Sequence, residues 1–172
     1  MNPITSREFE SLFRPGVRAF HLEMRDVYRV EQEDVPFQRW IQGLPDDYSW
    51  REEWLSFVRA VTSAGTVIQR VRIVTEPHSD YVRWERELDP QNAKAGEDIR
   101  YLPRAQASDI TLPAEDCWLF DDDQLVLSLF KPDGRSGGYA TEDDPQLVAQ
   151  YRAVRDEVWA RAIPYAEYHP AG

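Results

Sequence analysis

Two arginines stand inside a short apolar segment, and they are the residues of this sequence that most clearly invite chemistry. The segment 66–74, TVIQRVRIV, is rich in β-branched residues and predicts a buried strand, yet it carries Arg70 and Arg72. Alternate side chains of a strand share a face, so both guanidiniums point to the side opposite Val71 and Ile73. A desolvated guanidinium is costly unless a carboxylate or a bound anion pairs with it. The sequence therefore predicts a charged sheet face that is neutralised by a partner.

Two interpretations of these arginines are open. In the first, which we favour, they form a structural lattice of ion pairs with nearby acids, because such lattices are a common source of charged clusters. In the second, Arg100 and Arg104 join them, and four guanidiniums hold the phosphate or carboxylate of a small anionic ligand. The residues predicted to bind that ligand are Arg70, Arg72, Glu76, Tyr81, Glu85, Glu97, Arg100 and Arg104.

No other group of residues has the spacing of a known catalytic or metal site. His21, His78 and His169 lie in no metal or triad motif, and Cys117 has no basic neighbour to activate its thiol. The chain also lacks the glycine-rich phosphate loops and the G-x-S-x-G elbow. We therefore expect no catalytic residue, no metal ion and no cofactor.

The composition is typical of one folded acidic domain, and we expect residues 1–172 to form it. The 31 acidic and 20 basic residues give a net charge of -11, which repels a phosphate backbone, so we expect no direct nucleic-acid partner. The single cysteine excludes an internal disulfide and indicates a reducing compartment. The opening residues MNPITSREFESLF lack the pattern of a signal peptide, and no segment approaches the roughly 20 apolar residues that span a bilayer. We expect a cytoplasmic protein without a membrane partner.

Helices and strands are expected to alternate along the chain. Apolar residues at helical spacing predict helices over 5–13, 35–43, 49–65, 77–88 and from 143 or 144 to 164, although 77–88 could also form a strand. Ser49 and Glu52 are expected to form a capping box, and Pro36 to lie in a first helical turn. Strands are predicted over 17–24, 66–74, 97–103, 116–120 and 125–130, with 121–124 as a hairpin turn and 132–144 as a loop. This alternation predicts a single-domain α/β fold, a mixed β-sheet flanked by helices.

Several segments together resemble a known family. They are FHLEMRDVYRV, RVRIVTEPHSDYVRWE, GEDIRYLPRA, CWLFDDDQLVLSLF and RAIPYAEY, and they span most of the chain. The sequence resembles an actinobacterial family known only as a domain of unknown function, sixty-eight seventy-nine. The resemblance implies a small protein encoded near helix-turn-helix regulators, which suggests a regulatory role, and it implies no established biochemical activity.

A weaker resemblance is to one half of a phospholipase D-like domain, whose strands carry a His-x-Lys-x-x-x-x-Asp motif. Segment 110–130, ITLPAEDCWLFDDDQLVLSLF, looks like that motif region, with Asp121 or Asp122 at the aspartate place. The other two places hold unsuitable residues, Ala114 or Glu115 for the histidine and Asp116 or Cys117 for the lysine. The resemblance thus implies a phospholipase D-like half whose nucleophile is missing and whose pocket has become a binding site.

We expect a non-enzymatic binding or regulatory module that recognises a small anionic ligand or a protein, such as a helix-turn-helix regulator. The alternative is a small biosynthetic-pathway enzyme in which Tyr81 and a carboxylate, Glu76, Glu85 or Glu97, act as general acid and base. A deep pocket around a strongly perturbed carboxylate or tyrosine would favour the enzyme, and an exposed apolar patch with acidic rims would favour an interaction protein. Direct DNA binding, a third class, predicts a contiguous basic face.

Overall fold

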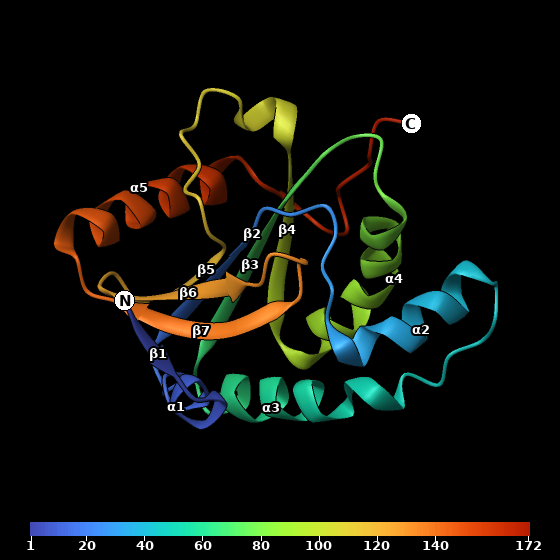
Figure 1. Cartoon of the computed structure of the whole chain (residues 1–172), viewed down its shortest axis with the longest axis horizontal. Helices are drawn as coiled ribbons and strands as arrows, with labels where there is room; N and C mark the ends of the chain where they lie inside the picture. Colours follow the sequence, from blue (N-terminus) through green and yellow to red (C-terminus); the bar gives the residue numbers. More distant parts are fainter.

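One mixed β-sheet runs through the molecule (Figure 1). The computed structural model describes residues 1–172. Its strands are β1 (Asn2–Ile4), β2 (Arg18–Glu23), β3 (Val67–Val74), β4 (Glu97–Pro103), β5 (Cys117–Phe120), β6 (Gln124–Phe130), β7 (Ser136–Glu142) and β8 (Ile163–Pro164). Their order in the sheet is β1-β7-β6-β5-β2-β3-β4-β8. Strands β2, β3 and β4 are parallel neighbours, and the other strand pairs are antiparallel.

Five α-helices cover the two faces of this sheet (Figure 1). They are α1 (Ser6–Glu10), α2 (Glu31–Ile41), α3 (Glu52–Ser63), α4 (Asp80–Ala95) and α5 (Pro145–Arg161), with short 3-10 turns η1 (Ser49–Arg51) and η2 (Arg104–Ala107). Helix α5 packs on one face, whereas α1, α3 and α4 pack on the other and α2 lies against α4. The prediction of an α/β fold with a mixed sheet flanked by helices is confirmed. No helix is long and apolar enough to cross a membrane.

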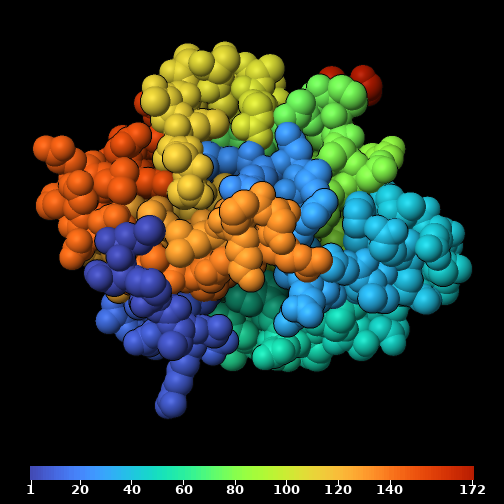
Figure 2. Space-filling view, in the orientation of Figure 1, coloured from blue at the N-terminus to red at the C-terminus, as the bar shows by residue number.

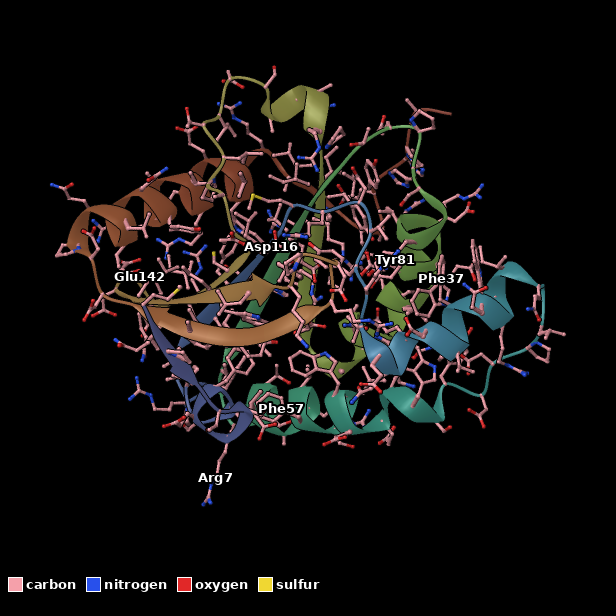
Figure 3. The ribbon with its side chains drawn as sticks, viewed as in Figure 1. Arg7, Phe37, Phe57, Tyr81, Asp116 and Glu142 are labelled. Atoms are coloured by element: carbon pink, nitrogen blue, oxygen red, sulfur yellow. The ribbon has the colours of Figure 1, made fainter.

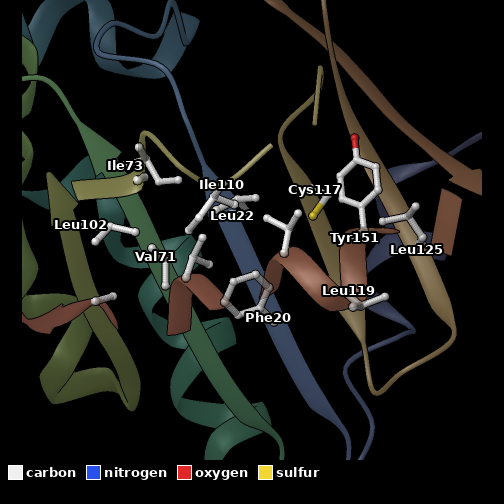
Figure 4. Packing of buried hydrophobic residues seen from close by; sticks show 14 of the residues in the cluster. Phe20, Leu22, Val71, Ile73, Leu102, Ile110, Cys117, Leu119, Leu125 and Tyr151 are labelled. Atoms are coloured by element: carbon white, nitrogen blue, oxygen red, sulfur yellow. The ribbon is translucent and has the colours of Figure 1, made fainter. Parts of the chain in front are cut away.

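The face under α5 carries the larger apolar core. Phe20, Leu22, Val71 and Ile73 alternate with the charged residues of β2 and β3 and point toward α5 (Figure 4). All four are almost fully buried. Burying each such side chain contributes roughly 1.5–3 kcal/mol. This layer therefore anchors the central strands and leaves the opposite face available for charge.

The opposite face changes from apolar to charged along the strands. At one end Ala19, Ile68 and Trp118 pack with residues of α1 and α3. Further along the same faces of β2 and β3 come Glu23 and Arg72, which lie beneath α4. Arg70 and Arg72 thus share one face, opposite Val71 and Ile73, as the strand period predicts. The charged half of the sheet forms the floor of the site described below.

Most predicted helices are present, with corrected boundaries. Helix α2 begins at Glu31 with three acids in its first turn, so Pro36 lies inside the helix and not in the first turn. The expected capping box of Ser49 and Glu52 is wrong, because Ser49 begins η1 and its backbone N–H donates to Asp47 Oδ1 at 2.9 Å. Thr5 is the N-cap of α1, and its side chain accepts from the N–H of Glu8. The segment beginning near Pro77 is helical, with Ser79 as the N-cap of α4.

The largest correction concerns the segment 132–144, which was expected to be a loop and contains strand β7. The glycines that suggested a loop allow a close strand approach. A Cβ on Gly137 would lie 3.2 Å from the carbonyl oxygen of Leu129, beside the irregular pairing at Leu129 and Phe130. Local sequence preference also missed β1 and β8, which are short and stabilised by pairing with β7 and β4.

We predict that Gly96→Ala destabilises the fold by at least about 2 kcal/mol. Gly96 joins α4 to β4 at φ 121°, and an added Cβ would lie 2.5 Å from Thr62 Oγ1 on α3. Thr62 Oγ1 donates to the carbonyl oxygens of Val58 at 2.7 Å and Ala95 at 2.9 Å, so moving the hydroxyl group would break these hydrogen bonds. Urea unfolding measures the change.

Gly43→Ala is the matched control for Gly96→Ala. Gly43 also has a positive φ, 70°, but an added Cβ there meets nothing within 4 Å. Its substitution should cost only the backbone strain of about 1 kcal/mol. Equal losses for the two variants would contradict the steric role of Thr62.

Candidate functional site

The site is built on Glu23, whose carboxylate lies between two arginines of the neighbouring strand. The β2–β3 register places Glu23 opposite Arg72 and His21 opposite Arg70. Glu23 Oε1 accepts from Arg70 Nη1 at 2.8 Å, and Glu23 Oε2 accepts from Arg72 Nε at 2.8 Å. Each oxygen thus holds a different guanidinium, and the bridge links the strands side chain to side chain.

Two further carboxylates complete this ion lattice. Arg70 donates to Glu97 Oε1 of β4 through Nη2 at 2.8 Å and Nε at 3.2 Å. Arg72 Nη1 donates to Asp89 Oδ1 of α4 at 2.5 Å and to Tyr101 Oη at 2.8 Å. The lattice therefore joins three parallel strands and α4 through buried charge-assisted hydrogen bonds.

The electrostatics of the lattice favour its ionised form. Burial alone would raise the pKa of Glu23, but the guanidiniums of Arg70 and Arg72 outweigh burial and hold that pKa well below its usual range. Burial would lower the pKa of both arginines, but the facing carboxylates outweigh it and raise the pKa of each guanidinium. These contacts are those of the structural lattice that the sequence analysis favoured.

A cavity of about 500 Å³ lies over the lattice, between the sheet and helices α3 and α4. Its rim is formed by β7, the N-terminal residues, the start of α2 and α3, which Figure 2 shows in orange, dark blue, light blue and teal. Figure 3 shows three lining residues, Phe57 on α3, Tyr81 on α4 and Asp116 before β5. Other aromatic lining residues are Phe9, Tyr28, Trp50, Trp54, Trp118, Phe130 and Tyr139. The cavity thus has an ionic floor and largely aromatic walls.

Besides Glu23, three buried or half-buried acidic side chains line the cavity: Asp116, Glu33 and Glu85. Asp116 Oδ1 accepts from the N–H of Met24 at 2.9 Å, and Asp116 Oδ2 accepts from the hydroxyl of Tyr28. Glu33 accepts from the hydroxyl of Tyr81. Glu85 makes no hydrogen bond, and its nearest cation, Arg72 Nη2, is 3.6 Å away.

Burial raises the pKa of all three groups. The pKa of Asp116 rises to about 6, and that of Glu33 rises through burial despite its hydrogen bond from Tyr81. The pKa of Glu85 rises furthest above its usual range, because burial and the charges of Glu23 and Glu33 outweigh Arg72. Burial therefore shifts the balance at Glu85 toward its protonated form.

Two ring nitrogens of the lining lack a hydrogen-bond partner. His21 and Trp118 occupy paired positions on β2 and β5, and their rings stack with centroids 4.1 Å apart. His21 Nδ1 and Trp118 Nε1 are buried without a partner. Burial lowers the pKa of His21 to about 3, so its ring is neutral. Buried polar atoms are rarely left unsatisfied, and these two belong to residues that line the cavity.

The eight predicted site residues are only partly brought together. Arg70, Arg72, Tyr81 and Glu85 line the cavity, and Glu97 is buried in the lattice beside Arg70. The other three lie elsewhere: Arg100, Arg104 and Glu76.

The predicted cluster of four guanidiniums is wrong. Arg100 pairs in register with Val71, so it shares the α5 face, where its guanidinium lies 3.7 Å from the ring centroid of Trp159. Arg104 donates to the carbonyl oxygens of Met24 at 2.5 Å and Ile73 at 3.2 Å beyond the end of β4. Glu76 instead accepts from Tyr168 Oη at 2.5 Å. Strand register, which decides the face of Arg100, was not used in the sequence argument.

Sequence reasoning missed several site residues. Glu23 was detectable, because Ala19, His21 and Glu23 alternate with the apolar Phe20 and Leu22 along one predicted strand. Glu33 and Asp116 carried no local signal, because they come from a helix start and a loop that only folding brings to the sheet. Nowhere in the chain do three or more His, Cys, Asp or Glu side chains form a group that could hold a metal ion.

The positions indicated by the phospholipase D-like resemblance do not form one site. Asp116, at the lysine place, lines the cavity. Asp122, at the aspartate place, is exposed in the β5–β6 turn and accepts from Arg155 at 2.7 Å. The two carboxylates therefore serve different parts of the molecule.

We predict that Arg72→Met lowers the free energy of unfolding by about 3–5 kcal/mol, because it leaves buried carboxylates without their cation. Arg83→Met is the control, since the Arg83 pair with Asp80 is exposed and should contribute about 1 kcal/mol or less. Adding Asp89→Asn to Arg72→Met should recover part of the loss. Denaturant unfolding of wild type, Arg72→Met, Arg83→Met and the double variant measures these differences in stability. A loss below about 1 kcal/mol for Arg72→Met would contradict the lattice.

A second prediction concerns Asp116 and pH. Because the folded-state pKa of about 6 exceeds the ordinary value of 3.8, the folded state retains a proton that the unfolded chain releases. The stabilisation is complete below about pH 4 and is lost as pH rises through about pH 6, a change of up to about 3 kcal/mol. Asp116→Asn should flatten this part of the stability profile, and Asp123→Asn, in the exposed turn, should not. Parallel profiles for Asp116→Asn and wild type would refute the assignment.

One similar solved structure is TrmBL2, an archaeal chromatin protein whose structure shows a novel mode of DNA binding. The match has 10% identity and a TM-score of 0.45, and it covers 92% of this chain and 50% of that one. The chain thus spans half the length of that protein. No curated protein matches the chain.

The expectation of no direct nucleic-acid partner is corrected by this match. That expectation rested on the net charge of -11 alone. Net charge describes the field of the whole molecule and not the surface that a partner would touch, so by itself it does not exclude a nucleic-acid partner.

A family model shows where the chain belongs. The model is described as Domain of unknown function (DUF6879), and it matches residues 7–170. It therefore covers strands β2 to β8, the lattice and the residues around the cavity from Phe9 to Tyr139. The chain belongs to this family of domains of unknown function, DUF6879.

Proposed function

We propose that this protein is a binding module for a small organic molecule, which it holds in the cavity over the ion lattice. The observation that carries the proposal is the cavity itself. Its volume of about 500 Å³ lies within the range of small-molecule sites. Its lining combines aromatic rings with a few convergent polar groups, which is the usual chemistry of such sites.

The lattice beneath the cavity supports a preorganised site. Arg70 and Arg72 are each held by two carboxylates, and Tyr101 Oη donates to Asp89 Oδ2 at 2.6 Å. A ligand would therefore meet a floor that is already ordered, which reduces the entropy cost of binding. Trp118 Nε1 would gain a partner that the protein does not provide.

The expected anionic ligand has weaker support than the cavity. An anion would compete with Glu23, Glu97 and Asp89, which already pair with these guanidiniums. It would also approach the carboxyl groups of Glu33 and Asp116. Binding is therefore proposed without a requirement for negative charge.

Regulation in the cytoplasm and descent from a phospholipase D-like half are further proposals. They rest on the two sequence resemblances. The first of these implies an actinobacterial origin and a gene near helix-turn-helix regulators. A buried, unpaired Cys117 is compatible with a reducing compartment. A protein partner finds some support in the exposed apolar residues Val35, Ile41 and Leu44 on and after α2.

A second candidate function is general acid–base catalysis in the same cavity. The observation that favours it is the pairing of two perturbed groups: burial raises the pKa of Tyr81, and burial raises the pKa of Glu85 on the next turn of α4. A cavity enclosing such groups is what the enzyme alternative required. A protonated Glu85 could donate its proton to a bound substrate.

The test combines native mass spectrometry of protein purified from its source with a thermal-shift panel of small metabolites. We expect a retained molecule, or stabilisation by a panel member, that Ser128→Phe abolishes. Ser128 faces the cavity from β6 and its side chain donates no hydrogen bond, so the added ring would fill the space. Ser108→Phe adds the same ring at an exposed position after η2 and should retain binding.

Mass analysis of the same incubations separates the two candidates. An unchanged ligand identifies a binding module, whereas conversion that Ser128→Phe abolishes identifies an enzyme. If the protein retains nothing and no panel member stabilises it, both candidates fail.

A further inference from the structure

We propose that the molecule bound in this cavity carries a protonated amine, and that Glu85 is its counter-ion. The inference rests on the proposed function, because it concerns the occupant of the same cavity. It names a ligand class, organic ammonium compounds with an apolar or aromatic body. Three features of the site support it: its charge, a Glu85 carboxyl group without hydrogen bonds, and the aromatic walls.

The charges around the cavity leave acids in excess. Six acidic residues line it, whereas only three cationic residues do, Arg51, Arg70 and Arg72. Arg70 and Arg72 are committed to lattice carboxylates. Arg51 is also engaged, because it donates to the Leu88 carbonyl at 3.3 Å, to Gln91 Oε1 at 2.7 Å and to Asn92. Each lining cation therefore already has acceptors in the protein, and the one guanidinium nitrogen of Arg72 without a hydrogen bond, Nη2, lies 3.6 Å from Glu85.

Glu85 is the acid of the inner cavity with no hydrogen bond and one long ion pair. Its side chain is only 10% exposed, lines the cavity from α4 and takes part in no hydrogen bond. The nearest cation, Arg72 Nη2, lies 3.6 Å away, and other nitrogens of that guanidinium already bind Glu23 and Asp89. A buried carboxyl group without hydrogen bonds is costly for the fold, which is a common mark of a functional position.

The walls suit an ammonium group with an aromatic or aliphatic body. Aromatic rings attract cations through their π faces, and a desolvated site strengthens this attraction. Rings of Tyr28, Trp50, Tyr81 and Trp118 line the same cavity as Glu85. The neutral ring of His21, with Nδ1 unpartnered, adds a polar atom on the floor without adding positive charge.

Binding of a cation should be coupled to loss of a proton. Burial raises the pKa of Glu85 and so favours its protonated form. The titratable and charged groups packed around it are Glu23 and His21 on β2, Arg70 and Arg72 on β3, Tyr101 on β4, Glu33 on α2, Arg51 in η1, Asp116 before β5, and Tyr81 and Asp89 on α4. An ammonium group beside Glu85 would favour its ionised form, so binding releases the proton. Affinity for an amine should then rise with pH, by up to about tenfold per pH unit below the pKa of Glu85.

The experiment uses matched probes that differ in charge and share one scaffold. Tyramine, para-hydroxyphenylacetamide and para-hydroxyphenylacetate form one such set, and the corresponding indole compounds form a second. Calorimetric titration of the full chain from about pH 6 to about pH 8, in two buffers of different ionisation enthalpy, gives both affinity and proton release. We expect the amines to bind best, with protons released and affinity rising with pH.

Two variants assign the effect to Glu85. Glu85→Gln should fold normally, because it keeps the size of a side chain that makes no hydrogen bond. It should weaken amine binding by about ten- to a hundredfold and remove the proton release. Glu87→Gln removes an exposed acid two residues along the same helix and should change neither quantity.

The outcomes separate this inference from the proposed function. If amides or carboxylates bind better than amines, or if amines bind without proton release, the amine assignment is overturned and the binding module stands. If no probe binds but the protein retains a neutral or anionic metabolite, the amine assignment again fails alone. The amine assignment and the binding module both fail if no probe binds and if no molecule is retained, or stabilises the protein, in a way that Ser128→Phe abolishes.

Discussion

The structure depends on neutralising two guanidiniums on a buried sheet face. Arg70 and Arg72 can lie there only because Glu23, Glu97 and Asp89 meet them at hydrogen-bond distance. Two of these acids come from the flanking parallel strands, so the ion pairs require one register of β2, β3 and β4. A slip by one residue would turn the acids to the α5 face and leave the arginines unpaired. The lattice thus specifies the sheet as well as contributing to its stability.

The same lattice explains why a cavity lies over the sheet. Helix α4 must place Asp89 beside Arg72, and η1 is tied to α4 through Arg51, which fixes the helices at the edge of the charged face. The apolar residues of α1 and α3 pack further along, around Ile68 and Trp118. Between these contacts the floor is ionic and cannot be covered by apolar side chains without desolvation cost. The space that remains is lined by acids and aromatic rings, which is why its charge decides what it can bind.

Local sequence patterns predicted a helix or strand correctly where the residues of that element alone determine it. The alternation in TVIQRVRIV predicted β3 and the shared face of its arginines, and helical spacing predicted α4 with Tyr81 and Glu85 on it. Such patterns failed where a partner strand decides the outcome. Strand β7 contains Gly137 and Gly138, which indicate a loop until the close approach of β6 is known. Net charge likewise does not decide whether nucleic acid binds, because it averages over every surface.

The sequence by itself determined an α/β chain with a mixed sheet, a charged face on β3 and acids sufficient to neutralise it. Only the tertiary structure decided which acids those are. Arg100 lies on the other face because register pairs it with Val71, whereas Glu23, Glu33 and Asp116 converge from separate segments. The physical reason is that strand periodicity is a local property, while register, cavity shape and desolvation arise from contacts between distant residues. Such contacts, not composition, leave Glu85 buried without a hydrogen bond, 3.6 Å from Arg72 Nη2.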